Sequence, residues 1–327
     1  MPVIEVLAYT LCAAGIIGAA IPLIPEQIWW LRAWTYPRVQ MALINTGLLM
    51  LFLLLVGVTG AVSGLIAIGL ILTIMLCLRD ILPFMPYMPK QSPDLTSPDS
   101  GASIKMVLGN VLMENENASE LLVSIRRKNP DLVFMVETNA KWRGYLSELE
   151  AEYPYTYLLP LEDFNGMLFY SRYEILNVSE RYLVQDHIPS LSIDLNLGQQ
   201  TVRFFGVHPR PPRPEDDTEK MDRELDIIAA EAKNCPHPVI VSGDLNDVGW
   251  SAETKSFLQT SGLLDPRRGR GLFNTFNAKN PIVRWPLDHL FHSQHFGTIA
   301  IERLPKFGSD HFPMFVHLGL KIGVSHD

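Results

Sequence analysis

The sequence has few cysteines and few charges. Three cysteines occur in 327 residues, so the chain shows no framework of disulfide pairs, which leaves its redox compartment undecided. Charged residues make up 19% of the chain against 47% hydrophobic residues, a balance that excludes a disordered protein. Residues 1–102 carry a net charge of −1 and residues 103–327 carry −7. The two parts therefore face different solvents.

Two long stretches contain no charged side chain. The first is 6–25, and the second, 39–78, is interrupted by the glycine-rich segment VGVTGAVSG. A helix needs roughly 20 apolar residues to cross a bilayer, so the first stretch predicts one span and the second predicts a hairpin of two. Buried core helices and a cleaved signal peptide are weaker alternatives, because the helices are apolar all round and no basic region precedes the first. We predict a membrane anchor of three transmembrane helices in residues 1–82.

The residues that flank these spans bear on orientation. The aromatic residues between the first two spans, which predict an interfacial belt, are Trp29, Trp30, Trp34 and Tyr36. The basic residues near the spans, all on one predicted side, are Arg32, Arg38, Arg79 and Lys90. The positive-inside rule then favours a multi-pass protein of the cell membrane with its carboxy-terminal domain in the cytoplasm. Four charges leave the side open.

Residues 83–102 are rich in proline and predict an extended linker. The expected strands of the following domain are 104–112, 131–137, 166–172, 190–197, 201–208, 238–246, 287–293 and 312–318. The expected helices are 116–129, 139–152, 215–234 and 251–261. A mixture of hairpins and helical crossovers favours a layered α/β domain with mixed sheets at 103–320, followed by a tail at 321–327.

Polar residues gather at the ends of the apolar strands. Those at or near a carboxyl end, or directly before a strand, are Asn110, Glu137, His208, Asp244, Asn246, Asp288, Asp310 and His311. A single Asn or Asp in such a place is more often a turn or cap residue, but eight residues drawn only from Asn, Asp, Glu and His are harder to explain that way. Carboxylate and amide oxygens suit a hard cation, and no cysteine–histidine cluster has zinc spacing. The pattern predicts Mg²⁺ or Mn²⁺ acting on phosphate.

These residues also form a recognisable series of motifs. In chain order they are GNVL, FMVET, NGMLFYSR, GVHPR, SGDLND, PLDHLF and GSDHFPMFV. Together they resemble the endonuclease/exonuclease/phosphatase superfamily, which includes neutral sphingomyelinases and inositol polyphosphate phosphatases. The resemblance covers residues 103–320 and implies a four-layer α/β sandwich with two mixed β-sheets, here preceded by three transmembrane helices.

The resemblance implies a role for each strand-end residue. Glu137 is the clearest metal ligand, with Asn110 and Asp310 close to the same ion. His311, oriented by Asp288, is implied to act as general base or as a positioned proton carrier.

The remaining members of the set are implied to handle water and phosphate. Asp244 aligns the attacking water, while Asn246 and His208 donate to phosphoryl oxygens. Asn165 is a weaker member, because a turn role explains it nearly as well. Arg210 is a candidate contact for the substrate.

Other polar residues have simpler interpretations. The histidines expected to pack or to be structural are His289, His292, His295 and His317. The acidic stretch 215–224 predicts the solvated start of a helix. The basic residues Arg210, Arg213, Arg267, Arg268 and Arg270 leave two alternatives open: exposed charge, or contact with a second anionic group of the substrate.

The net charge of the domain bears on the substrate. A nuclease usually shows a basic stripe, and this domain is acidic, so a long nucleic acid is disfavoured. The linker would hold the site near the bilayer, where lipid headgroups are concentrated. Some bacterial members of the superfamily with amino-terminal membrane helices resemble this layout, and a glycopeptide-resistance group among them acts on a lipid-linked pyrophosphate outside the cytoplasm.

The leading hypothesis is therefore a membrane-anchored, metal-dependent phosphoesterase acting on a lipid-linked or membrane-proximal phosphoester or pyrophosphate. The alternatives are a membrane-tethered endonuclease or exonuclease, and a non-catalytic interaction module on the same fold. The bilayer is the one partner indicated besides the phosphorylated substrate, and no protein partner is inferable.

Overall fold

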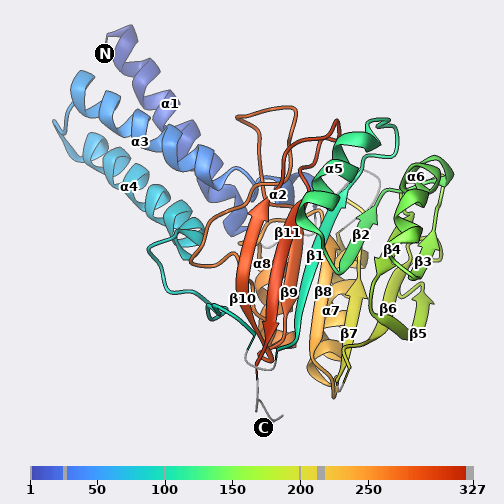
Figure 1. Cartoon of the computed structure of the whole chain (residues 1–327). Helices are drawn as coiled ribbons and strands as arrows, with labels where there is room; N and C mark the ends of the chain where they lie inside the picture. The colour runs from blue at the N-terminus through green and yellow to red at the C-terminus, as the bar shows by residue number, and fades with distance from the viewer. Residues whose placement is uncertain (1, 25–27, 99–100, 199, 212–217, 322–327) are drawn as a thin grey trace. The chain divides into compact units, whose positions relative to one another are not determined.

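The structure, a computed structural model, describes residues 2–24, 28–98, 101–198, 200–211 and 218–321 (Figure 1). It divides into two units, one made of Met1–Met88 with Pro212–Thr218 and the other of Pro89–Pro211 with Glu219–Asp327. Arg213, the first residues of the expected helix 215–234, and the tail after residue 321 lie outside the described residues. Each unit is described by itself.

The first unit is helical. Its helices are α1 (Val3–Ala20), α2 (Trp29–Ala33), α3 (Arg38–Leu55) and α4 (Ala61–Ile81), with 3₁₀ turns η1 (Ile21–Leu23) and η2 (Leu82–Phe84). Three stretches, Val3–Leu23, Arg38–Leu55 and Ala61–Phe84, are long and apolar enough to cross a membrane. Three such helices at the expected places agree with the predicted anchor.

Small residues and one buried amide hold these helices together. The buried face of α1 consists of Ala8, Cys12, Gly15, Gly18 and Ala19. Small side chains let helix backbones approach closely, and a β-carbon at Gly15 would lie 2.5 Å from the Asn45 Oδ1 atom. Asn45 Nδ2 donates to the Gly15 carbonyl at 3.2 Å and to Thr73 Oγ1 at 2.9 Å. Asn45 thus joins α3 to both other long helices.

A buried ion pair closes one end of the same bundle. Arg38 Nε, at the start of α3, lies 3.0 Å from Asp80 Oδ2 near the end of α4, and both side chains are 3% exposed. Arg38 Nη1 also donates to the Ala19 carbonyl at 2.8 Å. Asp80 therefore balances the charge of Arg38 at this end of the bundle.

The second unit contains two β-sheets. The strands of the first sheet, in order across it, are β10 (Phe296–Arg303), β11 (Met314–Leu320), β1 (Ser103–Asn110), β2 (Leu132–Val136), β4 (Met167–Ser171) and β3 (Tyr155–Leu159). Those of the second are β5 (Glu174–Arg181), β6 (Ser190–Asn196), β7 (Thr201–Gly206), β8 (Val239–Asp244) and β9 (Asp288–His292). The pairs β1–β2 and β7–β8 are parallel and the other pairs are antiparallel, so both sheets are mixed, as expected.

Alternation along the strands produces four layers. Side chains such as Phe134 and Phe169 of the first sheet and Phe204 of the second form the core between the sheets. The opposite face of the first sheet packs on α5 (Ala118–Lys128), α6 (Ala140–Leu146) and the 3₁₀ turn η3 (Ser147–Ala151). The opposite face of the second sheet packs on α7 (Glu219–Lys233) and α8 (Ala252–Ser261). The predicted four-layer sandwich is confirmed.

Three strands were missed by the sequence patterns. β3, β5 and β10 each end a sheet, and most of their residues are only partly buried, so they lack the continuous apolar runs of the central strands. The acidic start of α7 is exposed at Glu219, as expected, but Glu224 is buried, with 3% exposure.

Replacement of Asn45 by Ala should loosen the helical unit. The loss of two interhelical hydrogen bonds should lower the free energy of unfolding by about 0.5–2 kcal/mol. Equilibrium unfolding in mild detergent, followed by helical circular dichroism, measures this. Thr46→Ala is the matched control, because Thr46 Oγ1 donates only within its own helix, to the Ala42 carbonyl. Equal stability of the two variants would contradict the role given to Asn45.

Candidate functional site

The candidate site forms where strands of both sheets end. Asn110 ends β1 and Glu137 follows β2 in the first sheet, while Asp244 ends β8 in the second. His208 lies two residues beyond β7, and Asp288 begins β9, which runs antiparallel to β8. Because β1–β2 and β7–β8 are parallel pairs, their carboxyl ends lie at the same edges of the sheets. The topology thus brings together residues that are far apart in the chain.

The backbone at this edge is tightly constrained. A β-carbon at Gly243 would lie 1.8 Å from the Val207 carbonyl oxygen, and one at Gly166 would lie 1.8 Å from that of Thr138. Glu137 and Asn246 adopt φ angles of +58° and +51°, in the left-handed region that few side chains occupy. Unfavourable backbone conformations of this kind concentrate at functional sites.

The carboxylate of Asp244 lies at the centre of the site. Its Oδ2 atom accepts a hydrogen bond from Asn110 Nδ2 at 3.0 Å and lies 3.6 Å from His311 Nε2 and 3.9 Å from His208 Nε2. Its Oδ1 atom accepts from the backbone N–H of Asn246 at 2.9 Å. Four of the predicted residues therefore surround one buried carboxylate.

Asn110 joins the two sheets through its amide. Its Nδ2 atom donates to Glu137 Oε1 at 2.7 Å as well as to Asp244 Oδ2. Its Oδ1 atom accepts from the backbone N–H of Leu112 at 2.8 Å, which fixes the orientation of the amide. Asn110 is therefore a donor to two carboxylates here, and coordination of a cation by its oxygen would require the amide to turn over.

His311 and Asp288 form the expected pair. His311 Nδ1 donates to Asp288 Oδ2 at 2.7 Å, and the Phe276 ring lies 5.1 Å from the imidazole. Burial lowers the pKa of His311, but the carboxylates of Asp288 and Asp244 outweigh burial and raise it to about 10. The ring is therefore protonated at neutral pH. This favours a proton carrier and anion ligand over a general base.

Burial shifts the pKa values of the neighbouring groups. It raises the pKa of Glu137 to about 7 and also raises that of Asp244. It lowers the pKa of His208, whose two ring nitrogens have no hydrogen-bond partner among the described residues. Asp288 Oδ1 is buried and likewise without a partner there. The site thus combines several buried carboxyl groups with buried polar atoms that have no hydrogen-bond partner among the described residues.

This donor set fits a divalent cation. Oxygen-rich, acidic clusters suit Mg²⁺ or Mn²⁺, and the charge of Asp310 adds to that of Asp244 in raising the pKa of Glu137. A second grouping, Asp244, Asp288 and His311, has ligand atoms within 4.8 Å of one another. A cation there would compete with the proton that His311 shares with Asp288, so the Glu137 side is the better place.

The other predicted residues are placed as follows. Asn165 is 4% exposed, and its Nδ2 atom has no partner among the described residues, which argues against a simple turn role. Asn246 Nδ2 donates to the Pro209 carbonyl at 3.0 Å, next to the half-buried Arg210. His289 is fully buried, as its packing role predicted.

Within the basic cluster at 267–270, two arginines form ion pairs inside the domain rather than being exposed. Arg267 is fully buried and paired with Asp265 at 2.8 Å, and Arg270 pairs with Asp94 at 2.5 Å. Two arginines that the sequence did not single out contact the residue that follows His311. Arg284 and Arg303 stack on the ring of Phe312, at 4.9 and 4.3 Å from its centroid, directly after His311. Sequence reasoning could not have paired these two arginines, because they are 19 positions apart and only the fold brings them together.

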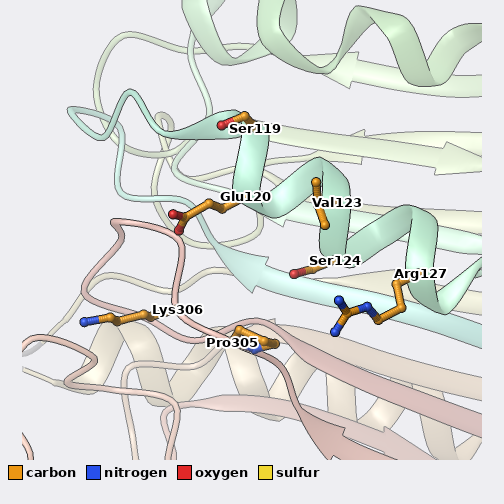
Figure 2. A pocket seen from close by; sticks show the side chains of 7 residues that line it. All are labelled: Ser119, Glu120, Val123, Ser124, Arg127, Pro305 and Lys306. Carbon is orange, nitrogen blue, oxygen red and sulfur yellow. The ribbon is translucent and has the colours of Figure 1, made fainter.

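A separate pocket of about 460 Å³ lies between α5 and residues 305–306 (Figure 2). Its lining residues are Ser119, Glu120, Val123, Ser124, Arg127, Pro305 and Lys306. It contains none of the residues of the strand-end site.

Comparison with known proteins identifies the fold. The model of the Endonuclease/Exonuclease/phosphatase family matches residues 109–311, from the residue before Asn110 to His311. No curated protein sequence matches the chain.

Similar solved structures include an endonuclease/exonuclease/phosphatase from Bacteroides vulgatus, with 16% identity and a TM-score of 0.56 over 67% of this chain and 99% of that one. D. rerio TDP2 complexed with single-strand DNA product has 16% identity and a TM-score of 0.55, over 66% of this chain and 99% of that one. Sphingomyelinase C from Streptomyces griseocarneus has 20% identity and a TM-score of 0.50, over 66% and 99%. At these identities the likeness establishes the fold.

Glu137→Gln should stabilise the cation-free protein. A carboxyl whose pKa rises on folding destabilises the fold as pH rises from about 4.5 to about 7, and the cost is constant above that. The amide retains an acceptor for Asn110 Nδ2 but carries no charge. At pH 8 in chelator the variant should gain on the order of 2 kcal/mol, or roughly 5 °C in Tm, and the gain should vanish near pH 4.5.

Thermal unfolding across this pH range tests the effect. The exposed Glu148→Gln variant, which removes a surface carboxylate that pairs with Arg126, is the control. A Glu137→Gln gain that does not depend on pH would show that buried charge is not its cause.

Proposed function

The chain belongs to the endonuclease/exonuclease/phosphatase family, and from that membership we propose that it is a metal-dependent phosphoesterase anchored in a membrane by its three amino-terminal helices. Members of the family hydrolyse phosphoester bonds. The observation that carries the proposal is the buried cluster around Asp244. Its polar atoms lie within 4.0 Å of a neighbour in the cluster, and its members are Asn110, Glu137, His208, Asp244 and His311.

Glu137 and Asp310 would hold a Mg²⁺ or Mn²⁺ ion, with Asn110 beside it. The ion would neutralise charge on the phosphoryl oxygens. Asn110 would keep Glu137 and Asp244 in place, since it donates to both.

The other side chains would act on the substrate and the attacking water. His311, protonated and oriented by Asp288, would donate to a phosphoryl oxygen and stabilise charge that grows in the transition state. His208, neutral because burial lowers its pKa, has one ring N–H for the same purpose. Among the described residues, neither His208 nor the Asn165 amide nitrogen has a hydrogen-bond partner. Asp244, whose pKa burial raises, would orient the water and accept its proton.

Arg284 and Arg303 support a substrate with a second anionic group. Burial and the neighbouring Arg284 lower the pKa of Arg303, so the two guanidinium groups lie close enough to repel each other. Neither forms an ion pair within the described part of the chain, where each donates to a backbone carbonyl: Arg284 to Asn277 and Arg303 to Asn274. A bound anion would relieve this repulsion. Such a compact pair suits a pyrophosphate or a lipid phosphodiester better than a long nucleic acid, which needs a basic stripe.

The anchor supports a lipid-linked or membrane-proximal substrate. A covalent link to helices inserted in a bilayer would raise the effective concentration of headgroups for the domain. We propose the cytoplasmic side for the domain, on the basic residues that flank the spans. A reporter fused to the carboxyl terminus and scored for cytoplasmic or periplasmic activity tests it.

Detergent-solubilised protein should hydrolyse lipid phosphates or pyrophosphates with Mg²⁺ and lose this activity in chelator. Glu137→Ala and His311→Ala should each lower kcat by about 10²–10⁴-fold, whereas His317→Ala, a half-buried histidine of β11, should not. Inositol phosphates and nicked or abasic DNA complete the panel. Turnover of DNA alone would establish the membrane-tethered nuclease, and full activity of both site variants would refute the site. A folded protein inactive on every substrate would support the interaction module.

Arg284→Gln and Arg303→Gln should discriminate between substrates. If the pair binds a second anionic group, each variant should lower kcat/KM about tenfold or more on a pyrophosphate, as expected for one charged hydrogen bond, and much less on a monoester with one phosphate. Arg126→Gln, which breaks an exposed ion pair, is the control. Equal losses on both substrates would contradict the assignment.

A further inference from the structure

The segment that follows the helical unit is docked on the catalytic domain. Residues 90–95, called the strap from here on, add a short parallel bridge to edge strand β10. Leu95 N–H donates to the Thr298 carbonyl at 3.0 Å, and Thr298 N–H donates to the Pro93 carbonyl at 2.8 Å. The Leu95 side chain fills the space left by Gly297, where a β-carbon would lie 2.6 Å from Leu95 Cγ.

Side chains fasten the strap to three elements of the domain. Ser92 is fully buried, and its hydroxyl lies 2.7 Å from Thr298 Oγ1 and 2.8 Å from His292 Nε2. Arg270 Nη2 donates to the Ser92 carbonyl at 2.8 Å and to Asp94 Oδ1 at 2.5 Å. Buried hydrogen bonds of this kind are costly to leave unmade, so the segment is part of the folded domain.

The strap also contacts the loop 264–271, which in turn contacts the backbone of Asp288, the partner of His311. Gln91 Oε1 accepts from the Asp265 backbone N–H at 3.0 Å. The Asp265 carboxylate binds the Arg267 side chain through Nε at 3.0 Å and Nη2 at 2.8 Å. Arg267 Nη1 then donates to the Asp288 carbonyl oxygen at 3.3 Å, and Nη2 lies 2.6 Å from His289 Nδ1.

His289 extends this network to the next loop of the site. Burial and the charge of Arg267 lower the pKa of His289 to about 3, so its ring is neutral. With Nδ1 accepting from Arg267, Nε2 carries the hydrogen and donates to the Asp247 carbonyl at 2.8 Å. The network therefore binds two backbone carbonyls of the site, those of Asp288 and of Asp247, the residue after Asn246.

We propose that the strap is a positioning element for catalysis: by holding the 264–271 loop it keeps Arg267 on the Asp288 backbone, and so keeps Asp288 and His311 aligned. The inference rests on the proposed function for its kinetic consequence. Gln91 and Ser92 are positioning residues, because they act on the site only through Asp265 and His292. Since the strap begins at Lys90, six residues after the last candidate span ends at Phe84, the segment that aligns the site is joined directly to the anchor.

Two variants of the full-length protein in detergent test this. Gln91→Ala removes the bond to Asp265, and Gly297→Ala drives a β-carbon against Leu95. Each should speed hydrogen exchange of backbone amides in 264–271 and at the start of β9, and should lower kcat about tenfold or more with KM unchanged, because small displacements of reacting groups have effects of this size.

Matched controls separate release of the strap from general loosening. Lys90→Ala removes only an exposed ion pair with Asp94, and Gly144→Ala adds a β-carbon where no atom lies within 4 Å. Both should resemble wild type. Faster exchange in 264–271 with unchanged kcat, or unchanged exchange in both variants, would overturn the proposal. If wild type hydrolyses no phosphorylated substrate, the proposed function fails, and exchange at the start of β9 still decides whether the strap positions Asp288.

Discussion

The burial of carboxylates between the ends of two β-sheets is the constraint on which the rest of this structure depends. Asp244 is shielded from water with Glu137 and Asp288 nearby, and burial of a charge is costly unless it is paired and hydrogen-bonded. The fold supplies donors from both sheets: Asn110 from the first, and the Asn246 backbone from the second. The apolar core between the sheets fixes the position of one sheet against the other, and so holds these donors close to the Asp244 carboxylate.

The same constraint explains why the backbone is unusual where the chemistry lies. Gly166 and Gly243 let the backbone at Thr138 and Val207 approach closely, and Glu137 and Asn246 adopt positive φ angles at the same edge. A carboxylate cluster of this kind lowers stability without a cation. The remainder of the sandwich, with three continuous cores, offsets that cost.

Much of the fold could be predicted from sequence, because central strands and amphipathic helices leave local patterns. The strand-end residues were found for the same reason: a polar residue at the end of an apolar run can be recognised in the sequence alone. The orientation of Asn110 was not predictable, since it depends on the approach of the Leu112 N–H to the Asn110 Oδ1 atom in the turn after β1. The burial of Arg267 was not predictable, and exposed charge and substrate contact were both left open, because its contact with the distant His289 arises only in the folded domain. Edge strands such as β10 were missed because half-exposed strands lack a continuous apolar signal.

The docked strap has a practical consequence for the boundaries of a soluble fragment. A fragment that starts at the first strand of the sandwich, near Ser103, would lack Leu95 and leave Gly297 and Gly319 beside an empty groove. It would also expose unpaired backbone groups of Thr298 on edge strand β10, and an open edge is a template for intermolecular pairing and aggregation. Poor solubility of such a fragment would then reflect the loss of one short segment rather than the loss of the membrane anchor.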